Sequence, residues 1–116
     1  MELNEAVKGK IEDYVKNNKI VLFLKGTPQQ PQCGFSAKTV AALDSVVPDY
    51  VAVNVLDDSE IREGIKGYGN WPTIPQLYID GELVGGCDIV QTMLNSGELH
   101  QVLGLDAPDR TAPEIT

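Results

Sequence analysis

The sequence predicts an α/β fold in which a mixed four-stranded sheet carries helices on both faces. Stretches with apolar residues at helical spacing alternate along the chain with short apolar runs of strand length. Two of the strands are joined through a helix and are expected to be parallel, by a right-handed crossover. The last two strands are joined by an Asp-Gly turn and are expected to be antiparallel.

The first helix is predicted from an apolar stripe at spacings of three and four, formed by Leu3, Val7, Ile11, Tyr14 and Val15. Asn17 and Asn18 end this helix. The run Ile20–Leu24 is continuously apolar, which is typical of a strand buried on both faces. Residues 25–32 contain two prolines and a glycine, and we expect them to form a loop.

A second helix is expected to begin at Gly34 and to be stopped by Pro48, with one apolar side formed by Val40, Leu43 and Val47. Residues 50–55 predict the second strand. The acidic run at 57–60 predicts the start of a third helix, because carboxylates favour the positive end of the helix dipole. This short helix is expected to end near residues 67–69, which include two glycines.

The remaining elements are an extended segment, a hairpin and a last helix. Residues 71–75 (Trp-Pro-Thr-Ile-Pro) are expected to be rigid, and the runs 76–79 and 82–84 predict a hairpin around an Asp-Gly turn. The last helix is expected to begin near Asp88, which has the spacing of a capping box with Gln91, and to be followed by a turn or two up to Leu103. This order of elements describes the thioredoxin-like architecture.

The length suits one domain, over residues 1–105. Residues 106–116 contain two prolines and little apolar surface, and they are expected to form a disordered tail. The net charge of −8 argues against nucleic acid and anionic membranes as partners, since both favour clustered Lys and Arg. The first residues lack the features of a signal or transit peptide, so a cytoplasmic location is expected, although a processed organellar protein would look the same.

The chain has two cysteines and one histidine, namely Cys33, Cys87 and His100. They are too few for a secreted disulfide framework or for a four-ligand metal site within one chain, so any metal must recruit other ligands. His100 is expected to lie on the surface.

Cys33 is the residue most clearly associated with chemistry. It lies where a loop meets a helix, and both the helix dipole and Lys25 on the same sheet edge would lower its pKa. The alternative is a buried, inert cysteine, but its neighbours at 31–36 are not typical of a core. Ser36 occupies the place of the second thiol in a C-x-x-C motif, so the chain lacks an internal resolving thiol.

Four motifs follow one another along the chain: Lys-Gly-Thr-Pro at 25–28, Cys-Gly-Phe-Ser at 33–36, Trp-Pro-Thr-Ile-Pro at 71–75 and Gly-Gly-Cys-Asp at 85–88. In this order and spacing they resemble the signatures of the monothiol, CGFS-type glutaredoxins, over residues 3–103. The length of the loop at 27–32 is also similar to that of this class.

The resemblance implies that the chain binds glutathione. Lys25 and Arg62 resemble the family's cationic residues at the glycine carboxylate, whereas the alternative for Arg62 is a solvated helix face, paired with Asp58. Pro75 resembles the family's cis-proline, which would turn the backbone of Ile74 outward to pair with glutathione like an added strand. Without the resemblance, an ordinary trans-proline would be favoured.

The resemblance also assigns residues around the last helix to glutathione. The N–H groups of Cys87 and Asp88 would bind the γ-glutamyl carboxylate, and the Asp88 side chain would pair with the ammonium. The alternative for Asp88 is a plain N-cap, and both roles can hold together. Phe35 and Thr73 complete the predicted binding set, and Trp71 is expected to pack beside it.

A [2Fe–2S] cluster takes four thiolate ligands, and each chain would supply Cys33 and one bound glutathione. The resemblance therefore implies a cluster-bridged homodimer that acts in iron–sulfur cluster transfer and in iron and redox homeostasis, with apo iron–sulfur acceptor proteins and a BolA-like protein as partners. One alternative is a glutathione-dependent oxidoreductase that acts on protein–glutathione mixed disulfides through Cys33, and another is a regulatory module that senses iron or redox state. Cys87 is predicted not to be a cluster ligand, while a disulfide between Cys33 and Cys87 stays open.

Overall fold

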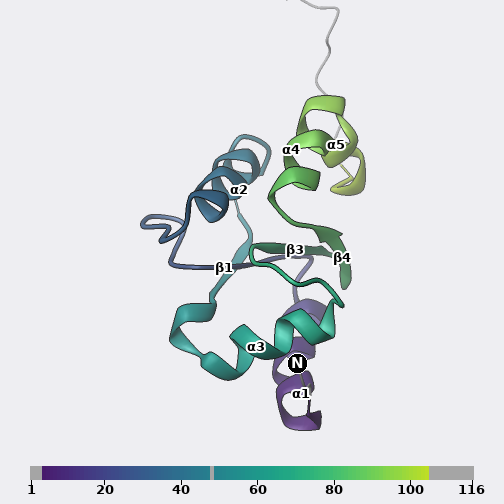
Figure 1. The fold of residues 1–116 in the computed structure, drawn as a ribbon. Helices are drawn as coiled ribbons and strands as arrows, with labels where there is room; N and C mark the ends of the chain where they lie inside the picture. The colour runs from purple at the N-terminus through teal and green to yellow at the C-terminus, as the bar shows by residue number, and fades with distance from the viewer. Residues whose placement is uncertain (1–3, 48, 105–116) are drawn as a thin grey trace, which may run out of the picture.

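A computed structural model describes residues 4–47 and 49–104. Its sheet has the strand order β2-β1-β3-β4 (Figure 1). The strands are β1 (Ile20–Leu24), β2 (Val51–Asn54), β3 (Gln76–Ile79) and β4 (Glu82–Gly85). β1 pairs with β2 in parallel and with β3 antiparallel, and β3 pairs with β4 antiparallel. The mixed four-stranded sheet predicted from the sequence is confirmed.

Helices cover both faces of the sheet. They are α1 (Glu5–Asn17), α2 (Gly34–Asp44), α3 (Ser59–Tyr68), α4 (Cys87–Ser96) and α5 (Glu98–Val102), with a short 3₁₀ helix, η1 (Val55–Asp57). In Figure 1, α1 and α3 lie on one side of the sheet, and α2, α4 and α5 lie on the other. This is the predicted thioredoxin-like architecture. No helix among the described residues has both the length and the apolar character needed to cross a membrane.

The sheet divides the core into two apolar clusters. Alternate residues of β1 face opposite sides, so Val21 and Phe23 belong to the cluster under α1 and α3, while Leu22 and Leu24 belong to the cluster under α2, α4 and α5. Each of these four side chains is fully buried. The prediction that this strand is buried on both faces is therefore confirmed.

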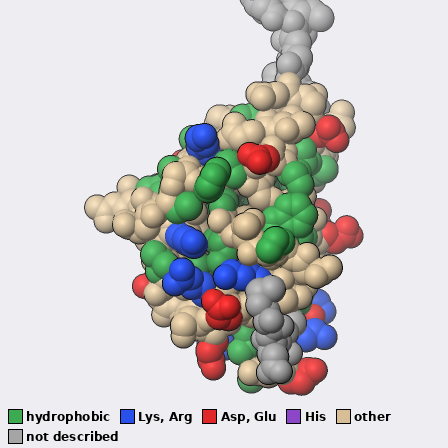
Figure 2. Space-filling view, in the orientation of Figure 1, with side chains coloured by type: hydrophobic (Ala, Val, Ile, Leu, Met, Phe, Trp, Pro, Cys, Tyr) green, Lys and Arg blue, Asp and Glu red, His purple; other side chains and the backbone are tan. Residues whose placement is uncertain are grey.

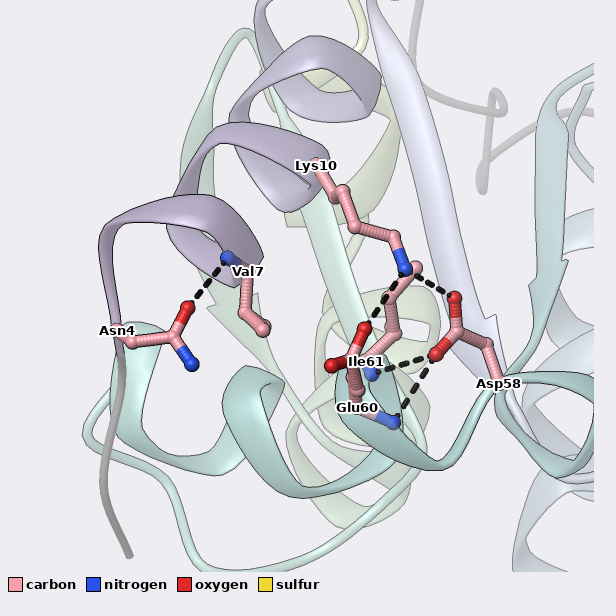
Figure 3. A network of polar contacts seen from close by, with 6 residues as sticks. All are labelled: Asn4, Val7, Lys10, Asp58, Glu60 and Ile61. Carbon is pink, nitrogen blue, oxygen red and sulfur yellow. Dashed lines mark hydrogen bonds and ion pairs between the residues drawn. The ribbon is translucent and has the colours of Figure 1, made fainter.

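Side-chain caps define the helices of the first layer. The Asn4 side chain accepts the Val7 N–H at 2.9 Å, and Asp58 caps α3 by accepting the Glu60 and Ile61 N–H groups at 3.0 and 3.2 Å (Figure 3). Lys10 of α1 reaches across to Asp58, with 2.7 Å between Nζ and Oδ2. One carboxylate thus begins α3 and also ties it to α1.

Two predicted boundaries differ from the structure. The second strand ends at Asn54, because the Asn54 side chain accepts the Leu56 N–H at 2.9 Å and so starts η1, which was not predicted. α2 ends at Asp44, where Ser45 donates its backbone N–H to Ala41 and its hydroxyl to Ala42. The predicted stop, Pro48, lies outside the described residues, as do Leu3 of the first apolar stripe and the predicted tail at 106–116.

The hairpin follows the prediction closely. Asp80 and Gly81 both adopt positive φ angles, 54° and 82°, which is the conformation that an Asp-Gly turn between two strands favours. The turn lets β3 and β4 pair side by side, and β4 leads directly into α4. The start of α4 is thereby placed beside the segment that precedes β3.

Candidate functional site

Cys33 is the N-cap residue of α2, in an extended conformation with φ −150° and ψ 136°. Its thiol is half-buried, whereas Cys87 is buried, with 8% of its surface exposed. Neither cysteine is in a disulfide. The accessible thiol of the fold therefore stands at the positive end of a helix, as the sequence predicted.

The surroundings of Cys33 lower the pKa of its thiol. The backbone N–H of Ser36 makes the largest contribution, although the thiol makes no regular capping hydrogen bond. Burial opposes this effect, and the Phe35 N–H, the Lys25 ammonium and the Ser36 hydroxyl lower the pKa further. All four groups favour the charged thiolate, so Cys33 is prepared to act as a nucleophile or as a metal ligand.

Ser36 does more than replace a second thiol. It is fully buried, and its hydroxyl oxygen accepts the backbone N–H of Lys25 at 3.1 Å. The adjoining loop is fixed at its base, since Gln32 donates its N–H to the Lys25 carbonyl at 2.8 Å and Gly26 donates its N–H to the Asn54 side chain at 2.9 Å. These bonds hold the chain on both sides of Cys33.

A groove of about 240 Å³ lies beside the first turn of α2 and is lined by Phe35, Trp71, Thr73, Ile74, Pro75, Gly86, Cys87, Asp88 and Ile89. One wall is the segment 71–75, with a cis peptide bond between Ile74 and Pro75. The facing wall is the beginning of α4. In Figure 2, a group of Lys and Arg side chains lies next to hydrophobic side chains on the face in view.

The structure brings most of the predicted binding residues together. Six of them line this one groove: Phe35, Thr73, Ile74, Pro75, Cys87 and Asp88. Lys25 lies outside the lining but close enough to Cys33 for its charge to lower the thiol pKa. Their roles toward glutathione stay predictions.

Arg62 is not among the groove-lining residues. It is half-buried on α3, and its side chain forms no ion pair with any residue that the structure describes. The suggested pairing with Asp58 is wrong, because Asp58 pairs with Lys10 instead. A role for Arg62 at the glycine carboxylate also stays a prediction.

The predicted capping box at Asp88 is wrong. Gly86 is the N-cap of α4, and Asp88 lies exposed in the first turn, while Gln91 donates its amide to the Lys38 carbonyl at 3.0 Å. The helix begins one residue earlier than expected, at Cys87, and the backbone at Gly86 packs closely against the segment 71–75. A Cβ there would lie 3.2 Å from both the Pro75 carbonyl oxygen and Trp71 Nε1.

This correction leaves the Asp88 side chain available to a ligand. Its carboxylate makes no hydrogen bond or ion pair within the described part of the chain, and Asp88 is one of the exposed residues that line the groove. His100 also differs from expectation: it is half-buried rather than on the surface, and its Nδ1 is buried with no hydrogen-bond partner within residues 4–47 and 49–104. Within those residues, no three His, Cys, Asp or Glu side chains come together in a way that could hold a metal ion.

Comparison with known proteins decides the family. The glutaredoxin family model matches residues 20–84. The probable monothiol glutaredoxin 2 of Rickettsia conorii is 53% identical over 93 residues, which is 80% of this chain and 87% of that protein. The chain belongs to the monothiol glutaredoxin family.

Other glutaredoxins are similar over nearly the same span. The mitochondrial monothiol glutaredoxin-5 of Schizosaccharomyces pombe is 52% identical over 104 residues, covering 87% of this chain and 71% of the relative. The solution structure of reduced poplar apo GrxS14 superposes with a TM-score of 0.76 at 46% identity, over 90% of this chain and 95% of the other. The resemblance drawn from the four motifs is therefore confirmed.

Two features of this glutaredoxin were not found from its sequence. Ile89 lines the groove from the first turn of α4, and the motif ends just before it. Gln76 is a fully buried polar residue directly after the Trp-Pro-Thr-Ile-Pro motif at 71–75. The sequence does carry a signal for the role of Gln76: a glutamine begins an otherwise apolar strand, and a buried polar group needs hydrogen-bond partners.

Proposed function

We propose that this monothiol glutaredoxin binds glutathione in the groove, and that Cys33 and the glutathione thiol together hold a [2Fe–2S] cluster between two copies of the chain. The observation that carries the proposal is a single accessible thiol with a lowered pKa beside a groove suited to a small peptide. A buried hydroxyl stands where a second thiol would resolve disulfides.

The groove offers groups that match the charges of glutathione. The first N–H groups of α4 have no partner within the helix and suit a carboxylate, and the exposed Asp88 carboxylate suits an ammonium. Lys25 carries a positive charge near Cys33, on the side where the second carboxylate of the peptide is expected. The backbone at Ile74 lines the same groove and suits pairing with a peptide.

The donor set of one chain fits part of a cluster site. Cys33 is the accessible thiolate, and Cys87, which lines the groove, is 8% exposed. A [2Fe–2S] cluster needs four ligands, so two Cys33 thiolates and two glutathione thiolates complete the set. The cluster is cargo in this proposal. Because half of its ligands are not covalently attached, it suits transfer to apo iron–sulfur acceptor proteins, in iron and redox homeostasis, with a BolA-like protein as a further partner.

Anaerobic reconstitution with iron, sulfide and glutathione tests the proposal. Size-exclusion chromatography with absorption spectra and bound-glutathione analysis should show a coloured dimer holding one glutathione per chain, whereas the apo-protein should be monomeric. Omitting glutathione, or using Cys33→Ser, should leave a colourless monomer. A stable cluster on a monomer, or one formed by Cys33→Ser, would overturn the ligand assignment.

The lowered pKa of Cys33 supports a second candidate function, reduction of protein–glutathione mixed disulfides. The Cys33 thiolate would attack the glutathione sulfur and release the protein thiolate. A second glutathione thiolate would then attack the Cys33–glutathione disulfide, releasing oxidised glutathione and restoring the Cys33 thiolate.

The cytoplasmic location stays a prediction, since the name of the Schizosaccharomyces pombe relative places that protein in mitochondria.

A further inference from the structure

We propose that Gln76 is a positioning residue for the groove, because its carboxamide holds the wall formed by residues 71–75 from beneath. The inference rests on the proposed function, since glutathione is the ligand whose binding it would support. Gln76 itself has no exposed surface and does not line the groove.

The Gln76 carboxamide is fully hydrogen-bonded. Its Nε2 donates to the Trp71 carbonyl at 3.1 Å and to the Thr73 carbonyl at 3.1 Å, and its Oε1 accepts the Tyr78 hydroxyl at 3.0 Å. The orientation of the amide follows from the chemistry, because carbonyl oxygens accept hydrogen bonds and only the nitrogen can donate to them. Both amide hydrogens are thus used on the groove wall.

This polar group lies in an apolar layer. Gln76 and Tyr78 share the face of β3 that packs toward α1 and α3, where Tyr78 contacts Phe23 edge-on with ring centroids 5.6 Å apart. Burying an amide among such neighbours is costly unless every polar atom finds a partner. Both hydrogen bonds that the Gln76 amide donates end on carbonyls of the groove wall, so the buried amide ties this wall to β3.

Gly69 leaves room for this network. A Cβ at Gly69 would overlap the Tyr78 hydroxyl and would lie 2.9 Å from Gln76 Oε1. The end of α3 therefore closes over the carboxamide and separates it from solvent. A shielded hydrogen bond is not weakened by competing water, so the two bonds to the wall are held firmly.

Fixing the wall sets the shape of the groove. Trp71 and Thr73 line the groove, and their carbonyls are the groups to which Gln76 donates hydrogen bonds. The facing wall comes close at the same point, since a Cβ on Gly86 would lie 3.2 Å from Trp71 Nε1. A wall held in place before the ligand arrives avoids the entropic cost of ordering it on binding, and this preorganisation raises affinity.

The experiment compares substitutions of Gln76, which remove the hydrogen bonds from its amide nitrogen to the wall, with a substitution of Tyr78, which removes the hydrogen bond to the Gln76 amide oxygen. Gln76→Met keeps the approximate volume and removes both donors, and Gln76→Glu keeps the shape but places a carboxylate oxygen against the two carbonyls. Tyr78→Phe is the matched control, because it removes the hydroxyl bond to Oε1 and leaves both donors to the wall intact. Trp71 is the single tryptophan of the chain, so its fluorescence reports directly on the wall.

Glutathione affinity is measured by calorimetry on the apo-proteins, and Trp71 emission is recorded without ligand, both at a temperature where circular dichroism shows each protein folded. We expect the Gln76 variants to bind glutathione about tenfold more weakly and to shift Trp71 emission, as loss of two shielded hydrogen bonds implies. Tyr78→Phe should match the unsubstituted protein in both measurements. The Glu variant serves if the Met variant does not fold.

Unchanged affinity and emission in the Gln76 variants would overturn the inference. Equal losses in the Gln76 variants and in Tyr78→Phe would also overturn it, because general loosening of the core would then explain the effect. Failure of the unsubstituted protein to bind glutathione would instead remove the proposed function, and the role of Gln76 with it. The three results are distinguishable within one set of titrations.

Discussion

Asp58 offers a test of how one carboxylate stabilises the fold. Its Oδ1 accepts the N–H groups of Glu60 and Ile61 at the start of α3, and its Oδ2 lies 2.7 Å from Lys10 Nζ (Figure 3). Asp58→Ala removes both the cap and the ion pair, whereas Asp58→Asn keeps an oxygen that can cap the helix and removes only the charge. The pair of variants therefore separates the two contributions.

The cap is expected to matter more than the ion pair. Loss of an N-cap costs about 1 kcal/mol, which corresponds to a fall in melting temperature of about 5 °C for a domain of this size. The ion pair joins side chains that are 43% and 30% exposed, so water and salt screen it. Asp58→Asn should therefore lose much less stability than Asp58→Ala.

The same carboxylate gives a pH dependence with a defined sign. The hydrogen bond from Lys10 is the main cause that lowers the pKa of Asp58 in the folded protein, below its ordinary value of 3.8. A carboxyl with a lowered folded pKa contributes stability above its unfolded pKa, and this contribution is lost as the pH falls through the folded value. The gap between the unsubstituted protein and Asp58→Ala should thus narrow below about pH 4.

Thermal and urea unfolding, followed by circular dichroism between pH 2 and pH 8, would measure these differences. Equal destabilisation by the Asn and Ala variants would refute the reasoning, because it would show that Asp58 stabilises the fold through its charge and not through the helix cap. A gap that widens at low pH would contradict the sign worked out for Asp58.

The other predictions concern the site. Asp88→Lys should weaken glutathione binding by repelling the ammonium, and unchanged affinity in calorimetry would remove Asp88 from the site. Cys87→Ser should still form a coloured dimer after anaerobic reconstitution, since the buried Cys87 thiol is not a predicted ligand; a colourless product would contradict this. Lys25→Met should raise the pKa of Cys33, seen as a shift to higher pH in the rate of iodoacetamide alkylation, whereas an unmoved profile would exclude the Lys25 charge as a cause. The unsubstituted apo-protein should be a weak reductase in a glutathione-coupled assay, and Ser36→Cys should have higher turnover because it adds a resolving thiol. Ser36→Cys should also be less stable, because the substitution removes the hydroxyl that accepts the Lys25 N–H. Turnover of the unsubstituted protein at the level of an efficient dithiol glutaredoxin would contradict the carrier role.

Periodicity and turn chemistry predicted the order of the main helices and strands and the mixed sheet. These signals are local, and the structure agrees with them at Ile20–Leu24 and at the Asp80-Gly81 turn. The error at the start of α4 arose where a side chain has a distant partner. Gln91 fitted a capping box by spacing, yet its amide reaches the Lys38 carbonyl on a different helix.

The candidate site shows the same limit. The motifs placed six of the predicted binding residues around one groove, because three of the motifs lie at the start of α2, directly before β3 and at the start of α4. The burial of Ser36 and the contacts of Gln76 could not be predicted, since they depend on how β1, α2 and the segment 71–75 meet in space. Arg62 was placed by resemblance alone, and local physics gave no independent support for its position.

The support that Cys33 receives from its own helix makes its reactivity a gauge of local folding. The amide hydrogens that favour the thiolate belong to Ser36 and Phe35, and they point toward the sulfur only while the first turn of α2 is wound. When that turn frays, the sulfur loses these two amide partners, and the pKa of the thiol rises toward its ordinary value. Any contact or substitution that loosens the turn should therefore slow the chemistry of Cys33, even where the exposure of the sulfur is unchanged.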